Sequence, residues 1–178
     1  MKSKSIFSIL FSFVILLTGC SSGSKNVFQW EKHKDYVVGL KINSFETKGI
    51  LIVEEETVSF LHGDPQSPLY GMTERFGENG YESLLYGIEW KSTEVKMQGE
   101  IIRNAVQMAE IKEGWAEKDD TLNGRGGRRR TLRSGSDWIE IFLEKETGNI
   151  LHLTAEIDGD RIELAFSNKN ETISFPSA

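Results

Sequence analysis

Residues 137–166 read DWIEIFLEKETGNILHLTAEIDGDRIELAF, which is three apolar runs with turn residues between them. Apolar residues occupy alternate positions of the second and third runs, as Leu153 and Ala155 do, and this is typical of strands with one buried face. The turns are Thr147-Gly148-Asn149 and Asp158-Gly159-Asp160, whose residue types favour tight reversals. We therefore predict an antiparallel meander of strands at 137–144, 150–157 and 161–166.

Earlier parts of the chain show the same alternation. It predicts strands at 36–43, 49–53, 57–62 and 83–91, and residues 172–175 suit a short edge strand. Residues 100–112 carry apolar residues at spacings of three and four and favour a helix, although Ile102, Asn104 and Val106 also fit an extended strand. The predicted fold is mainly β (α+β): a predominantly antiparallel, curved or partly closed sheet of about seven to eight strands with at most one long helix.

The composition describes an ordinary globular chain. It has 178 residues, of which 38% are hydrophobic and 27% charged, with 27 acidic and 21 basic side chains and three prolines. These values exclude a disordered or collagen-like chain. The single cysteine excludes both an intrachain disulfide framework and a zinc site built from several thiolates.

The N-terminus has the pattern of a secretory signal peptide. Lys2 and Lys4 precede residues 6–17, which carry no charge and only two serines. This stretch is too short to span a membrane as a helix, which needs about 20 residues. A positive segment followed by an apolar stretch of this length is typical of a signal peptide that is removed from the mature protein.

The sequence Leu17-Thr18-Gly19-Cys20 resembles the lipobox of bacterial membrane lipoproteins. The resemblance covers residues 1–20 and implies that residues 1–19 are removed and that Cys20 carries a diacylglyceryl group with palmitate-type chains. It also implies a protein anchored to the cell membrane on its extracytoplasmic face, because two acyl chains give stable anchoring. Residues 20–26 are then the lipidated cysteine and a flexible tether, and residues 27–178 form a single β-rich domain.

The most basic part of the chain is GRGGRRRTLR at residues 124–133. Arginine binds oxyanions through paired N–H groups, and glycine leaves the backbone approachable. One hypothesis is an anion-binding site for lipid headgroups or an anionic envelope polymer. The other is a solvated loop between the helix and the meander that rests on Asp119 and Asp120. No aromatic residue interleaves the arginines, so nucleic acid is not the predicted partner. The candidate anion-binding residues are Arg125, Arg128, Arg129, Arg130 and Arg133.

Residues 63–82 lack periodicity and contain Pro65 and Pro68, which predicts a long loop. Aromatic residues and methionine on an exposed loop are the types that anchor partner interfaces, for instance with an envelope protein. In the alternative interpretation these side chains fold back and cover one end of the sheet. The candidate partner-binding residues are Tyr70, Met72, Phe76 and Tyr81.

The sequence contains no recognised catalytic motif. His33, His62 and His152 lie in separate segments, and the chain has no H-E-x-x-H pattern, G-x-S-x-G elbow or nucleotide-binding glycine motif. His62 and Asp64 are two residues apart, which fits a turn better than a metal or hydrolytic site. We therefore predict no catalytic residue, no cofactor and no metal.

The leading hypothesis is a non-enzymatic lipoprotein that binds an envelope protein, an envelope polymer or a small ligand. Two alternatives remain. One is an envelope hydrolase with a dispersed site, which converging polar residues with shifted pKa values would favour. The other is a lipid or small-ligand carrier, in which apolar strand faces line a cavity of the curved sheet.

Overall fold

The structure is a computed structural model that describes residues 28–78, 80–92, 97–167 and 175. The predicted signal peptide, lipobox and tether lie outside the described residues, as does the predicted edge strand at 172–175 apart from Phe175. The strands before the helix are β1 (Asp35–Ile42), β2 (Phe45–Val53), β3 (Thr57–His62), β4 (Thr73–Gly77), β5 (Gly80–Leu85) and β6 (Ile88–Ser92). After helix α2 (Met97–Ala109) come β7 (Ala116–Leu122), β8 (Arg125–Ser134), β9 (Asp137–Glu144), β10 (Ile150–Ile157) and β11 (Asp160–Ser167).

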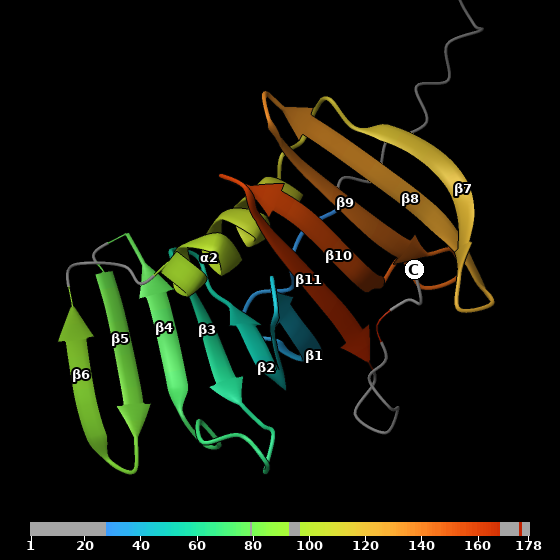
Figure 1. The fold of residues 1–178 in the computed structure, drawn as a ribbon. Helices are drawn as coiled ribbons and strands as arrows, with labels where there is room; N and C mark the ends of the chain where they lie inside the picture. The colour runs from blue at the N-terminus through green and yellow to red at the C-terminus, as the bar shows by residue number, and fades with distance from the viewer. Residues whose placement is uncertain (1–27, 79, 93–96, 168–174, 176–178) are drawn as a thin grey trace, which may run out of the picture.

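The eleven described strands form one antiparallel sheet in the order β6-β5-β4-β3-β2-β1-β11-β10-β9-β8-β7. β1–β6 form a first meander and β7–β11 a second, and the two join where Leu40 of β1 lies opposite Leu164 of β11. The sheet is curved and unclosed, with β6 and β7 as its outer strands (Figure 1). This confirms the predicted antiparallel curved sheet and corrects the number of strands from seven or eight to eleven.

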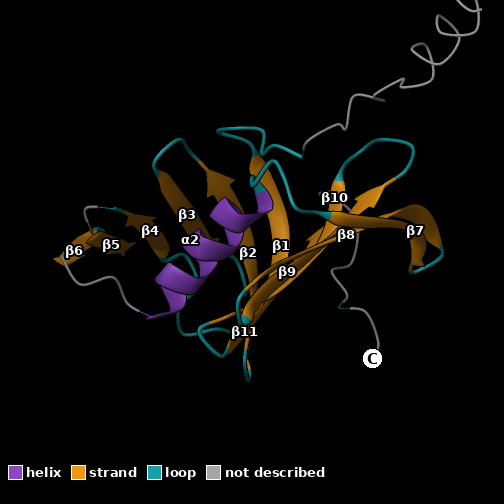
Figure 2. Cartoon of the chain, turned by 90° about the horizontal axis from the view of Figure 1, so that it is seen from above, coloured by secondary structure: helices purple, strands orange, loops and turns teal. Residues whose placement is uncertain are grey.

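Helix α2 connects the two meanders and packs against both of them (Figure 2). Its buried residues recur at spacings of three and four, which is the periodicity of a helix with one apolar face. These residues are Ile101, Ile102, Ala105, Val106 and Ala109. They join inward side chains of both meanders, such as Phe60 and Leu153, in one core. The helix predicted from residue 100 is confirmed, with an earlier start at Met97, and the alternative of an extended strand is wrong.

Two segments predicted as loops are strands. Residues 73–77 form β4 inside the stretch that lacks periodicity, and the arginine-rich tract forms β8. The single strand predicted at 83–91 is instead divided between β5, which begins at Gly80, and β6. The neighbouring strands supply carboxylates that balance the charge of β8: Glu117 of β7 pairs with Arg130, and Glu140 of β9 pairs with Arg129. A run of arginines is therefore compatible with a sheet, because opposite charges on adjacent strands stabilise cross-strand pairs.

Candidate functional site

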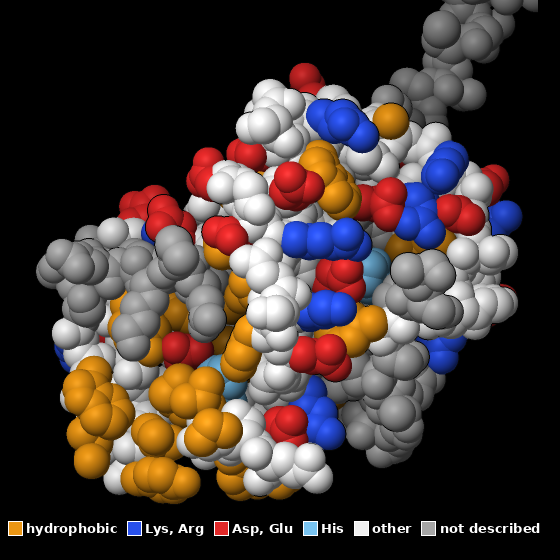
Figure 3. Space-filling view, viewed as in Figure 1, with side chains coloured by type: hydrophobic (Ala, Val, Ile, Leu, Met, Phe, Trp, Pro, Cys, Tyr) orange, Lys and Arg blue, Asp and Glu red, His pale blue; other side chains and the backbone are white. Residues whose placement is uncertain are grey.

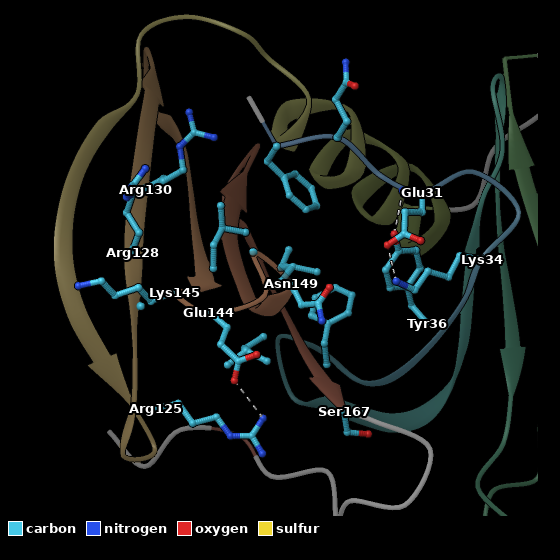
Figure 4. A pocket seen from close by; sticks show the side chains of 18 of the residues that line it. Glu31, Lys34, Tyr36, Arg125, Arg128, Arg130, Glu144, Lys145, Asn149 and Ser167 are labelled. Carbon is cyan, nitrogen blue, oxygen red and sulfur yellow. Dashed lines mark hydrogen bonds and ion pairs between the residues drawn. The ribbon is translucent and has the colours of Figure 1, made fainter. Parts of the chain in front are cut away.

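A pocket of about 590 Å³ lies on the core-facing side of the second meander. Its walls come from β8, β9, β10 and β11, from the start of β1, and from the segment that precedes β1 (Figure 4). Pockets of about 300–1,000 Å³ are typical of small-molecule sites. This one, which we call the ligand pocket, therefore has room for one small ligand.

Apolar and aromatic side chains form one part of the lining of the ligand pocket. Leu143, Leu151 and Phe166 line it from three neighbouring strands, because each of them continues the inward alternation of its strand. Phe28 and Tyr36 line it from the N-terminal side, and the rings of Tyr36 and Phe166 meet edge to face with centroids 5.9 Å apart. This part of the lining favours a hydrocarbon group, since such a group leaves water when it binds.

Charged side chains form the other part of the lining, which contains arginines and lysines as well as the carboxylates of Glu31, Asp35, Asp119 and Glu144. Arg125 and Arg128 reach the pocket from β8, and Lys145 reaches it from the turn after β9 (Figure 4). The ion pair of Arg128 is long, since its Nη1 lies 3.5 Å from Oε2 of Glu117. An ion pair at this distance is weak, so an anionic ligand can compete for the guanidinium group of Arg128.

Arg130 is the buried arginine of the pocket lining, with a side chain only 3% exposed. Its guanidinium carbon lies 5.0 Å from the ring centroid of Trp115, and its Nε lies 2.8 Å from Oε1 of Glu117. The contact with Glu117 is an ion pair without hydrogen-bond geometry, and neither Nε nor Nη1 has a hydrogen-bond partner within the described residues. A buried guanidinium with unused N–H donors is a favourable partner for an anionic group.

The five predicted anion-binding arginines do not share one site. Strand alternation separates Arg128 and Arg130 from Arg129, whereas Arg125 lines the ligand pocket from the first position of β8. Arg125, Arg128 and Arg130 line the ligand pocket. Arg129 lies on the opposite face, where Asp120 and Glu140 accept hydrogen bonds from it. Arg133 is exposed near the end of β8 and lines neither of the pockets described here. The sequence identified the tract, but the face to which each arginine points depends on the strand that replaces the predicted loop.

A second pocket, of about 520 Å³, lies on the opposite face of the second meander around Arg129 and His152. Burial lowers the pKa of His152, although the carboxylates of Glu163 and Glu140 act in the other direction. Cations and carboxylates of this pocket pair with one another, as Nη2 of Arg161 does with Oε1 of Glu163 at 2.7 Å. Its apolar lining consists of Leu122 and Phe175, so it offers a smaller apolar surface than the ligand pocket.

Buried polar side chains also meet on the first meander. Nε2 of His62 lies 2.7 Å from Oε2 of Glu74, and the hydroxyl of Tyr81 donates to Oε1 of Glu74 at 2.7 Å. Asp64, which the sequence placed beside His62, instead accepts a hydrogen bond from the backbone N–H of Gln66. Sequence analysis missed Glu74. The one available signal is its position two residues before the apolar Phe76, which puts both on the same face of a strand.

The predicted partner-binding residues separate into exposed and buried pairs. Tyr70 is 50% exposed on the loop between β3 and β4, and Met72 is half-buried. Phe76 and Tyr81 are only 1% and 3% exposed and stack with ring centroids 5.6 Å apart. Both residues are part of the core, which is the position that the alternative interpretation gives them. Partner binding at Tyr70 and Met72 stays a prediction.

Two structural features are absent among the described residues. No helix among them combines the length and the apolar character that crossing a bilayer requires. No three histidine or carboxylate side chains among them lie close enough together to hold a metal ion.

No protein-family model and no curated protein matches the chain. Similar solved structures include the lipoprotein LppX of Mycobacterium tuberculosis, at 8% identity and a TM-score of 0.43 over 79% of this chain and 89% of that one. LprF of Mycobacterium bovis is 11% identical, with a TM-score of 0.42 over 81% of this chain and 90% of that one. A LolA superfamily protein of Nitrosomonas europaea is 8% identical, with a TM-score of 0.34 over 76% and 85%. These scores are too low to transfer a function, so the site is interpreted from its own residues.

Proposed function

We propose that the protein is an extracytoplasmic, lipid-anchored binding protein and that its ligand pocket takes a small amphiphilic anion. The anchor is the predicted lipid on Cys20. The ligand combines an acidic head with an apolar tail, which makes the protein a carrier or receptor for such molecules at the cell membrane.

The ligand pocket combines apolar side chains with arginine guanidinium groups, and this combination is the observation that supports this ligand class. Leu143, Leu151 and Phe166 offer a surface for a hydrocarbon tail, while Arg128 and Arg130 offer guanidinium groups to the head. A basic surface without the apolar part favours a free anion, and an apolar surface without arginines favours a neutral lipid. The combination favours one molecule with both properties.

The ligand class can be tested with two probes that differ only in charge. A fluorescent fatty acid and its uncharged amide are titrated into the unlipidated chain of residues 21–178, which contains the whole described core from Trp30 to Leu164. We expect the acid to bind more tightly than the amide. Arg128→Gln should weaken binding of the acid about tenfold, because a hydrogen bond to a charged group is worth roughly 1.5 kcal/mol.

Arg133→Gln is the matched control, since Arg133 belongs to the same strand but lies outside the ligand pocket. It should leave the affinity for the acid unchanged. Equal affinities for the acid and the amide, or equal losses in the two variants, would contradict the proposed ligand class.

The anchor requires a separate measurement. Mass spectrometry of the protein from its native membrane should find Cys20 as the first residue, with a diacylglyceryl group on its sulfur. An unmodified Cys20 would remove the anchor from the proposal and leave the ligand pocket to be decided by the titration.

A further inference from the structure

The outer strand β6 has backbone groups available for pairing. It pairs with β5 on one side and has no partner strand on the other side among the described residues. Leu85 and Ile88 flank the two-residue turn Tyr86-Gly87, and the pair that flanks such a turn exchanges hydrogen bonds. Because antiparallel ladders alternate, the N–H and C=O groups of Glu89 and Lys91 then point away from β5, toward the open edge.

The two outer strands differ in their protection against pairing. β7 carries four consecutive charged residues, at positions 117–120, and charges of this kind discourage contact between sheet edges. β6 instead exposes Ile88 and Trp90, which are 56% and 50% exposed. Figure 3 shows hydrophobic side chains gathered over this end of the sheet. An outer strand with unused backbone groups and exposed apolar side chains is a surface for another strand.

The charges of β6 favour pairing with the β6 strand of a second copy of the protein. Glu89 and Lys91 supply the outward backbone groups, so a partner β6 must pair through the same two residues. With the two-fold axis beside Trp90, Glu89 of each copy lies opposite Lys91 of the other. The two neighbouring registers place Glu89 opposite Glu89 or Lys91 opposite Lys91, and like charges in such positions are unfavourable.

We propose that the protein forms a two-fold dimer in which the β6 strands of two copies pair antiparallel about Trp90. The register uses the outward N–H and C=O groups of Glu89 and Lys91 in both copies. The two Trp90 side chains face each other at a non-hydrogen-bonded position, where cross-strand side chains approach most closely. The lining of the ligand pocket includes no residue of β6, so dimerisation and ligand binding are independent.

Charge reversal provides the test. In sedimentation velocity at about 50 μM, the unlipidated chain of residues 21–178 should sediment as a dimer. Glu89→Lys and Lys91→Glu each place like charges opposite one another, and each should raise the dissociation constant at least about tenfold. An equimolar mixture of the two variants should dimerise again, because every facing pair in the mixed dimer has opposite signs.

Both substitutions should leave the fold intact. The ion pairs of Lys91 with Glu82 and Glu89 are 3.3 and 3.2 Å long and exposed, and pairs of this kind contribute little to stability. Circular dichroism of each variant verifies this. Trp90→Ser should weaken the dimer, whereas Ile111→Thr removes an exposed apolar side chain from a loop outside β6 and should not.

Three results would overturn the dimer: a monomeric wild-type chain, dimerisation that neither charge reversal weakens, or a mixture of variants that stays monomeric. Binding to phosphatidylcholine vesicles distinguishes the dimer from a lipid-binding surface. If a monomeric chain binds them and Trp90→Ser abolishes the binding, the exposed face of β6 contacts a lipid surface and the dimer is wrong.

Discussion

The Nε2 atom of His62 lies 2.7 Å from Oε2 of Glu74, a contact that joins β3 to β4 within the core. The two side chains are 2% and 14% exposed. The second oxygen of Glu74 accepts a hydrogen bond from Tyr81 of β5. One carboxylate therefore links three neighbouring strands, and its removal leaves two buried polar groups without this partner.

Replacement of this carboxylate should destabilise the protein strongly. We expect Glu74→Ala to lower the free energy of unfolding by about 3 kcal/mol, because buried polar groups that lose a charged partner keep their desolvation cost. Urea denaturation followed by circular dichroism measures the change. Glu82→Ala is the control: Glu82 is 43% exposed, and its loss should change stability by less than about 0.5 kcal/mol. Similar losses in both variants would contradict the role of Glu74.

The stability of the protein should decline at high pH because of Tyr81. Burial raises the pKa of Tyr81 to about 12; the Glu74 carboxylate also raises it and a hydrogen bond with Ser83 opposes this. In the unfolded chain the same proton is released near pH 10. The stabilisation from the neutral hydroxyl is therefore complete below about pH 10 and is lost as the pH rises toward 12.

Comparison with Tyr81→Phe isolates this contribution, since phenylalanine does not titrate. Urea midpoints measured between pH 8 and pH 11.5 should fall more steeply for the wild-type chain than for the variant. The other tyrosines are common to both proteins and cancel in the difference. Parallel curves would show that Tyr81 does not titrate differently in the folded and unfolded states.

One substitution in the turn between β5 and β6 should make the protein more stable. Tyr86 and Gly87 have φ values of 52° and 79°, nearly the same as the 51° and 79° of Asn123 and Gly124 in the turn between β7 and β8. Tyr86 is 83% exposed, so little packing compensates its left-handed backbone. Tyr86→Asn should raise the free energy of unfolding by about 0.5–1 kcal/mol, because asparagine tolerates this conformation better. The reverse change, Asn123→Tyr, should lower stability by a similar amount, and a lower melting temperature for Tyr86→Asn would contradict the argument.

Gly99 of α2 should not tolerate a methyl group. A Cβ atom at this position lies 2.0 Å from Cδ1 of the buried Phe76. Alanine gains about 1 kcal/mol of helix propensity over glycine, but overpacking in a core costs about 1–3 kcal/mol. We therefore expect Gly99→Ala to destabilise the protein by about 1–2 kcal/mol in thermal or urea unfolding. Gly126→Ala, where a Cβ meets nothing within 4 Å, is the control, and a stabilised Gly99→Ala variant would show that Phe76 moves aside without cost.

The spacing of apolar residues along the sequence predicted those strands and the helix in which buried and exposed residues recur regularly. The strands of the last meander alternate because β10 and β11 lie inside the sheet and pack one face on the core. Helix α2 could be predicted for the same reason, because Ile102, Ala105 and Val106 are spaced as on one face of a helix. β4 and β8 were missed because glycines and charges interrupt their alternation, and both become strands through their neighbours.

For the candidate site, too, some features could be predicted from the sequence and others could not. The arginine tract and its chemistry are properties of the sequence, as is the resemblance of residues 17–20 to a lipobox, which predicts an anchor at Cys20. The contacts of Arg130 with Trp115 and Glu117 could not be predicted from the sequence, because they depend on strand register. The same holds for the contact between His62 and Glu74.

By itself, the sequence determined the class of the fold, the single helix of the described residues and the position of the basic tract, since periodicity and charge are local. Only the tertiary structure decided which arginines face the ligand pocket, and that Phe76 and Tyr81 belong to the core. The physical reason is that a strand sends neighbouring residues to opposite faces, and only pairing with other strands decides which face is covered. The curvature of the sheet then brings Phe28 and Tyr36 together with β8–β11 around one pocket.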